Sequence, residues 1–177
     1  LLRAWGVAPL SPQEAASRAL DLPSIARGRG LEYLTVNGNL SLLRVLDLPA
    51  ILEVAPDDAS DWRFVTLDRL DDDGAELVVG RDRVSISTGV LAEAWYGKAH
   101  VLWRDLDRLG PVLAVGAVKP EVRRLHALLR DAGAYDGLDS PTFSPATEAA
   151  VLRFQRARRL LPDGKAGPMT VVALYQA

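Results

Sequence analysis

Cysteine is absent from the 177 residues of this chain. A thiolate metal site, a disulfide framework and a cysteine nucleophile are therefore excluded within it. An excess of one charge is missing too, because 21 Lys and Arg residues stand against 23 Asp and Glu residues and leave a net charge of −2. This balance argues against a general nucleic-acid-binding protein. No apolar run in the sequence approaches the roughly 20 residues of a membrane span.

Histidine is scarce, since the chain holds only His100 and His126. No carboxylate or serine accompanies His100 at the spacing of a catalytic motif, and for His126 a surface or half-buried role is expected. Two isolated histidines do not make a zinc site. The acidic run 71–74 lacks the spaced ligands and the terminal Glu of an EF-hand loop, so it is interpreted as a solvated turn. The sequence therefore predicts no metal and no cofactor.

Hydrophobic residues make up 49% of the chain, which is enough for a core and for one or two domains. The chain begins at Leu1, without Met and without a signal peptide. We therefore expect it to be a fragment of a longer protein, with any targeting signal outside it.

The first part of the chain predicts helices followed by an antiparallel sheet, which is an α+β layout. A capping box at Ser11 predicts a helix to about Leu20, and Asn39 and Thr88 are expected to cap two further short helices. Segment 24–30 is either a short helix or a loop. The four tryptophans are expected in the core rather than on a glycan platform. The expected strands are 31–36, 50–54, 62–70, 76–79, 83–87 and 99–103.

Glycine and proline interrupt the chain after residue 108, and 109–118 is predicted to connect domain 1–108 to domain 119–177. The second domain is predicted to hold three helices, at 120–131, 144–158 and 168–175. Ser144 can cap the second of these, and Asp163-Gly164 makes a turn before the third. The apolar face of that second helix is expected to contain Ala150, Val151, Phe154 and Ala157.

The second domain resembles the peptidoglycan-binding domain family, a three-helix type found beside many cell-wall hydrolases. Its matching positions are Leu125, Leu128 and Leu129, then Gly133 to Tyr135, Thr147 to Gln155, Asp163 to Thr170, and Leu174. The resemblance covers about residues 118–177 and implies a small three-helix bundle that binds peptidoglycan.

The first domain resembles the papain-like peptidases that trim bacteriocin leaders. The resemblance lies in the order of Trp5-Gly6, the capped second helix, Gly30 to Glu32, Leu42 to Arg44, Leu48 to Ile51 and Trp95 to Gly97. In that family a catalytic His opens the strand that begins here with Arg63, and the carboxylate that holds the His lies near the position of Gly80. Arginine is a permanent cation that cannot act as a base. The resemblance thus implies a degenerate peptidase domain with no catalytic residue in this chain, whose nucleophile would lie before Leu1.

A degenerate peptidase-like domain followed by this bundle resembles the periplasmic region of the GspA/ExeA family of type II secretion assembly proteins. The resemblance implies a non-catalytic periplasmic module that binds peptidoglycan and helps to assemble or anchor the secretin across the cell wall. It further implies a GspB-like inner-membrane partner. A separate AAA+ ATPase and a membrane helix would lie outside this chain, and a homo-oligomer is possible.

Two other functions stay open at this point. One is a cell-wall hydrolase or leader peptidase that uses the C-terminal bundle for targeting. The other is a protein-interaction module in which the former peptidase cleft holds a partner such as GspB.

Six residues are candidate peptidoglycan contacts: Tyr135, Arg153, Gln155, Arg156, Asp163 and Thr170. The arginines form either a solvated helix face or a contact for stem-peptide carboxylates, to which a guanidinium fork is suited. Gln155 can bond sugar amides or the Asp163 turn, and the turn is favoured. Tyr135 is a possible platform for a sugar ring.

Overall fold

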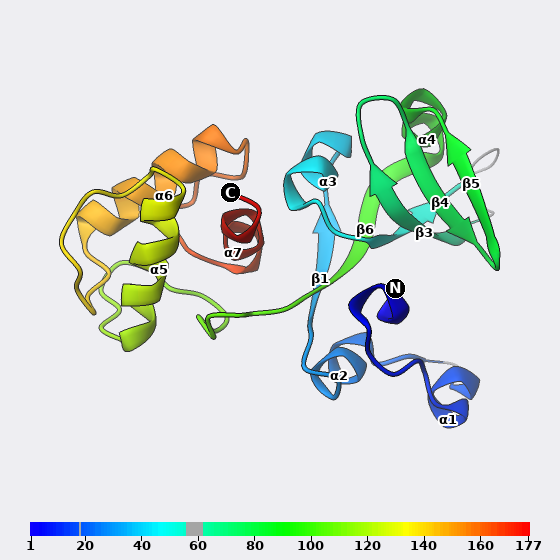
Figure 1. The fold of residues 1–177 in the computed structure, drawn as a ribbon, viewed down its shortest axis with the longest axis horizontal. Coiled ribbons are helices and arrows are strands. Elements are labelled where there is room, and N and C mark those ends of the chain that lie inside the picture. Colours follow the sequence, from blue (N-terminus) through cyan, green and yellow to red (C-terminus); the bar gives the residue numbers. More distant parts are fainter. Residues whose placement is uncertain (18, 56–61) are drawn as a thin grey trace. The chain divides into compact units, whose positions relative to one another are not determined.

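The computed structural model describes residues 1–17, 19–55 and 62–177. The chain divides into two compact units, Leu1–Arg104 and Asp105–Ala177 (Figure 1). Segment 109–118, expected to be a connector, pairs with the rest of the second unit. Leu113 and Ala166 exchange two backbone hydrogen bonds, and the Gly116 N–H donates to the Phe143 carbonyl. Among the described residues, no helix is both long and apolar enough to cross a membrane.

The described part of the first unit holds one antiparallel sheet in the strand order β1-β6-β2-β3-β4-β5. The α+β class predicted from the sequence is therefore confirmed. The strands are β1 (Glu32–Asn37), β2 (Ala50–Val54), β3 (Arg63–Leu70), β4 (Ala75–Val79), β5 (Asp82–Ile86) and β6 (Trp95–Trp103).

Alternation along the strands gives the sheet two different faces. On one face Ala50, Leu52, Val65 and Leu67 are all buried. The pairing of Glu53 with Phe64 and of Ile51 with His100 places those side chains on the opposite face, because neighbours across a ladder point the same way. Leu2 and Ile25 of the N-terminal segment line a cavity together with Ile51 and His100 of that second face, whereas Phe64 on the same face is 67% exposed.

The N-terminal segment forms the 3₁₀ helix η1 (Leu2–Trp5) and the helices α1 (Pro12–Ala16) and α2 (Leu22–Arg27). The capping box at Ser11 is present, but α1 ends at Ala16 rather than near Leu20. Ser17 ends it because its hydroxyl bonds to the backbone of Ala19, which competes with continued helix. Arg18 lies outside the described residues.

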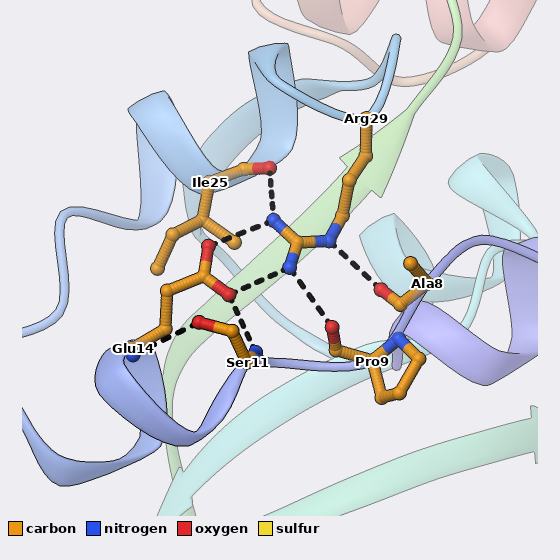
Figure 2. Close-up of polar contacts among 6 residues, drawn as sticks. All are labelled: Ala8, Pro9, Ser11, Glu14, Ile25 and Arg29. Carbon is orange, nitrogen blue, oxygen red and sulfur yellow. Dashed lines mark hydrogen bonds and ion pairs between the residues drawn. The ribbon is translucent and has the colours of Figure 1, made fainter.

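Arg29 ties this segment together (Figure 2). Its guanidinium makes a bidentate pair with Glu14, at 2.7 and 3.0 Å, and donates to the carbonyls of Ala8, Pro9 and Ile25. The Arg29 hydrogen bond, helped by the Ser11 N–H, lowers the pKa of Glu14 to about 2. A fork of five donors is well suited to such a junction, and Lys could not reproduce it.

Two helices join the strands of the first unit: α3 (Leu40–Leu46) and α4 (Thr88–Ala94). Asn39 caps α3 as predicted, since its side chain accepts from the Leu42 N–H. The sequence predicts Thr88 as the cap of α4, but the residue before it, Ser87, accepts from the Val90 N–H. The interpretation of the tryptophans as core residues is wrong for Trp62, which is 47% exposed, whereas Trp95 and Trp103 are buried.

The second unit contains α5 (Pro120–Asp131), α6 (Pro145–Ala157) and α7 (Pro168–Tyr175). Val122, Leu125 and Leu129 of α5 are fully buried, because their helical spacing puts them on one face. Ala157, expected on the apolar face of α6, is exposed at the end of the helix. All residues from Thr170 to Leu174 are buried, so α7 is enclosed on every side rather than along one stripe.

Candidate functional site

The two positions that would carry peptidase chemistry lie at one end of the sheet. Arg63 begins β3, opposite Val54 of β2. The pairing of Thr66 with Val78 carries β4 back to this end, where Gly80 occupies the β4–β5 turn at φ 65°. The fold therefore brings the expected catalytic positions together, but they hold a guanidinium and a residue without a side chain. Neither can accept a proton from a nucleophile.

The second face of the sheet carries a polar chain that the sequence does not reveal, because no carboxylate accompanies His100 at the spacing of a motif. His100 Nε2 lies 2.8 Å from Glu53 Oε1, and its Nδ1 lies 2.6 Å from the Tyr33 hydroxyl. Lys98 Nζ is also 2.8 Å from Glu53 Oε1. Because an ionised carboxylate only accepts, Nε2 donates to Glu53, and in neutral His100 the Nδ1 then accepts from Tyr33. The hydrogen bond from Lys98, followed by that from His100, lowers the pKa of Glu53.

No local signal could have revealed this chain, because Glu53 and His100 are 47 residues apart and Tyr33 and His100 are 67 apart. They meet only through the register of β2 and β1 against β6, in which His100 stands opposite both Ile51 and Thr35. The Thr35 hydroxyl extends the chain by donating to the Tyr33 oxygen at 3.0 Å.

Beside this polar chain the first unit has a cavity of about 310 Å³ with mostly apolar walls. The N-terminal segment and the covered part of the sheet face line it, with Leu2, Ile25, Ile51 and Leu102 among the apolar groups and Tyr33 and His100 as polar ones. Apolar pockets with a few converging polar groups are typical of binding sites.

In the second unit three of the six candidate residues, Gln155, Asp163 and Thr170, form one network around a buried amide. The Gln155 side chain is 1% exposed. Its Nε2 lies 2.8 Å from Asp163 Oδ1 and 3.0 Å from both the Lys165 carbonyl and Thr170 Oγ1. Its Oε1 accepts from the Gly164 N–H at 2.9 Å. One amide therefore links α6, the turn and the start of α7, and its polar atoms are occupied within the protein.

The turn itself requires glycine at its centre. Gly164 has φ 73°, and a Cβ there would lie 2.9 Å from Glu148 Cγ. Asp163 is exposed, but its Oδ1 accepts from both Gln155 and the Lys165 N–H. Asp163 and Thr170 thus hold the loop in shape, which is the structural role that the sequence favours for Gln155.

Tyr135 and Arg153 form a second group at the end of α5. The Tyr135 ring stacks on His126 with centroids 4.3 Å apart, and the Arg130 guanidinium lies 5.5 Å from its centre. The Tyr135 hydroxyl donates to the Leu138 carbonyl, and Arg153 donates to the Ala134 carbonyl. These contacts hold the loop after α5 against α6.

Arg153 and Arg156 are exposed on α6, on the outside of the helix whose inner side carries Gln155. Asp163 is exposed as well, but its Oδ1 is used within the loop, and Arg153 gives one of its donors to the Ala134 carbonyl. The two arginines therefore offer the exposed cations of the candidate set.

His126 is fully buried, not at the surface or half-buried as expected. Its Nε2 lies 2.9 Å from the Thr147 hydroxyl, and Nδ1 is without a hydrogen-bond partner among the described residues. Burial, together with the Arg130 charge, lowers its pKa. The ring therefore acts as a neutral core residue beneath Tyr135.

Comparison with known proteins links this geometry to a family. Residues 118–174 match the family described as "Putative peptidoglycan binding domain". The chain is 26% identical over 145 residues, 82% of its length, to general secretion pathway protein A of Aeromonas hydrophila, and it spans about a quarter (26%) of that protein.

Two solved structures are also similar to the chain. The periplasmic domain of the EpsAB fusion protein of the Vibrio vulnificus type II secretion system matches with a TM-score of 0.53 and 21% identity, over 97% of this chain and 72% of that one. This match shows a common fold. The N-terminal peptidase C39-like domain of a Vibrio parahaemolyticus toxin secretion ATP-binding protein matches with a TM-score of 0.43 and 24% identity, over 58% of this chain and 89% of that one.

Proposed function

We propose that this relative of the GspA/ExeA periplasmic region is a peptidoglycan-binding periplasmic module of a type II secretion assembly protein. The single observation that carries the proposal is the match of residues 118–174 to the peptidoglycan-binding family. The similarity to general secretion pathway protein A adds the secretion context.

The geometry of the second unit supports a prearranged binding surface. The Gln155 network fixes the 163–170 loop, and the stack of Tyr135 on His126 supports the loop after α5. Between them α6 exposes Arg153 and Arg156. A guanidinium presents paired donors to a carboxylate, and the stem peptides of peptidoglycan supply carboxylates. The surface therefore contacts the polymer through the two arginines, while the other four candidates hold it in place.

The first unit contributes no peptidase activity under this proposal. The resemblance to the peptidases puts Arg63 and Gly80 at the positions of the base and its orienting carboxylate, and neither residue can perform that role. The wider assignment includes help in assembling the secretin, a GspB-like partner, and inner-membrane anchoring by a segment outside this chain. Co-purification of the chain with such a partner would test that part separately.

Retention on purified sacculi tests the proposal. We expect the chain to sediment with sacculi, and Arg156→Glu to reduce the bound fraction several-fold, because a repelling carboxylate replaces a cation. Arg153→Glu should add to this effect, and salt should weaken binding by screening. Arg81→Glu, in the exposed β4–β5 turn of the first unit, is the matched control and should bind like the original chain. No retention of the original chain would disprove the proposal, and equal retention of all variants would remove the arginines from it.

A second candidate function is an enzyme, a cell-wall hydrolase or leader peptidase. The observation that favours it is the chain from Thr35 through Tyr33 and His100 to Glu53, which orients a histidine between a hydroxyl and a carboxylate. Incubation with muropeptides and with a leader peptide decides between the two. Cleavage that His100→Ala abolishes would establish the enzyme, and no cleavage by the original chain would exclude these activities.

A further inference from the structure

Three large aromatic side chains of the first unit are exposed. Trp62 is 47%, Phe64 67% and Tyr96 64% exposed. The rings of Trp62 and Tyr96 meet edge to face with centroids 5.6 Å apart, and Phe64 lies 6.3 Å from His100. Rings exposed in a cluster mark an interaction site more often than scattered apolar residues do.

Charged groups lie between these rings. Glu53 on β2 stands opposite Phe64 on β3, and its carboxylate is bound by Lys98 from β6 on the other side. Tyr96 belongs to the same strand as Lys98 and contacts Trp62, just before β3. Strands β3 and β6 are the two neighbours of β2 in the sheet. Rings carried by these two neighbours therefore lie on either side of the charged pair, and the two strands are roughly 10 Å apart, twice the strand spacing. We call Trp62, Phe64, Tyr96, Glu53 and Lys98 the aromatic face.

This composition distinguishes two kinds of occupant. The centre of a protein-docking patch is depleted of charge, and covering the Glu53–Lys98 pair with apolar protein surface would desolvate Lys98, whose side chain is 48% exposed, together with the 18% of Glu53 that is still exposed. A sugar ring instead has an apolar C–H side and a rim of hydroxyl and amide groups. Its C–H side can lie on an aromatic ring while its rim replaces the water bound to the carboxylate and the ammonium.

We propose that the aromatic face binds the glycan strand of peptidoglycan, a β-1,4-linked chain of N-acetylated sugars. The choice of this polysaccharide rests on the proposed function. The first unit then supplies a glycan contact, and the second unit contacts stem-peptide carboxylates. Two weak contacts to one polymer strengthen each other, because the second binding step is intramolecular.

Titration with a β-1,4-linked N-acetylglucosamine hexamer, followed by calorimetry and by amide NMR shifts of the full chain, tests the inference. This probe lacks stem peptides, so it isolates the glycan contact. We expect saturable binding with shifts at residues 62–64 and 96–98, and at least a tenfold loss of affinity in the double variant Phe64→Ala/Tyr96→Ala. Both side chains are exposed, so the fold should survive, which circular dichroism checks. Phe64→Tyr should keep affinity within about threefold, because it keeps the ring.

The matched control is Val84→Ala/Val90→Ala, which removes two other exposed apolar side chains of the same unit. It should bind the hexamer unchanged. Absence of hexamer binding, or equal binding by the Phe64/Tyr96 variant, would overturn the inference while leaving sacculus retention through the arginines intact. Conversely, hexamer binding without sacculus retention would contradict the proposed function, and would limit the aromatic face to free oligosaccharides. If the chain does not bind the hexamer but self-associates, and the Phe64/Tyr96 variant abolishes that self-association, then the partner of the aromatic face is a second copy of the chain and not a glycan.

Discussion

The polar networks of the two units are built over very different lengths of chain. In the second unit Gln155, Asp163, Gly164, Lys165 and Thr170 lie within 16 consecutive positions. In the first unit Tyr33, Glu53, Lys98 and His100 come from three strands. The first kind of network is fixed by a helix, a turn and a helix, and the second by strand register. A motif can therefore reveal the first kind but not the second.

Gln155→Ala should have the largest effect, because it removes four interactions of one buried amide. The Gly164 N–H and the Thr170 hydroxyl would lose a partner inside the protein, and the free energy of unfolding of the second unit should fall by roughly 3 kcal/mol. Hydrogen exchange of the α6 amides measures this loss. Arg156→Ala, the exposed neighbour, should change stability by less than about 0.5 kcal/mol. A loss below about 1 kcal/mol for Gln155→Ala would mean that the network is not what holds the turn.

Gly164→Ala should follow, with a loss of about 1–2 kcal/mol, because the left-handed backbone disfavours any Cβ. The close approach of Glu148 adds to the strain. Gly89→Ala in α4 is the control, since that position has no positive φ and its nearest neighbour is 3.8 Å away. There alanine should be neutral or stabilise by up to about 1 kcal/mol. Thermal unfolding of both variants compares them directly, and a neutral Gly164→Ala would show that the turn can relax.

Glu53→Gln probes the long-range network and should cost less, about 1 kcal/mol, because Lys98 is half-exposed and can turn to solvent. The lowered pKa of Glu53 means that its carboxylate stabilises the folded unit at neutral pH. That contribution should fade as the pH falls below about 4.5. Urea unfolding at pH 7 and pH 4, followed by tryptophan fluorescence, measures both effects. Glu93→Gln on exposed α4 is the control, and an equal change there would refute a specific role for Glu53.

The pH dependence that comes from His126 should be the smallest of these effects on stability, and it should appear only under mildly acidic conditions. Burial lowers its pKa, so below about pH 6.5 the unfolded chain binds a proton that the folded chain does not. The second unit should lose stability as the pH falls through this range, and be unaffected above it. NMR titration of the imidazole signals gives the pKa. His126→Gln should remove this part of the pH dependence, and a His126 pKa at or above 6.5 would contradict the expected direction.

The parts of the fold that could be read from the sequence are those with local causes. Caps at Ser11, Asn39 and Ser144 need only a side chain and a backbone N–H three residues on, and all three are present. The buried stripe of α5 follows from helical periodicity alone. The wrong prediction of Thr88 as a cap also has a local cause. Ser and Thr are both good caps, and here Ser87 and Thr88 are adjacent.

The predictions that were wrong concerned burial, which depends on whether segments distant in sequence pack over a residue. Trp62 is a large aromatic residue of a kind common in cores, yet its side chain is 47% exposed. His126 was expected near the surface, yet the Tyr135 ring and Thr147 enclose it. Burial is a property of the packed chain, so a single sequence predicts it only where periodicity reports it.

The sequence by itself determined the helical bundle and the Asp163-Gly164 turn, because each depends on residue type and short spacing. Tertiary structure alone decided which candidates face solvent: Gln155 is enclosed, whereas Arg153 and Arg156 stay outside. It also decided that His100 meets Glu53 and Tyr33 and that Phe64 and Tyr96 flank a charged pair. The physical reason is that strand pairing sets these neighbours, and pairing is selected by the burial of a whole sheet face rather than by any one residue.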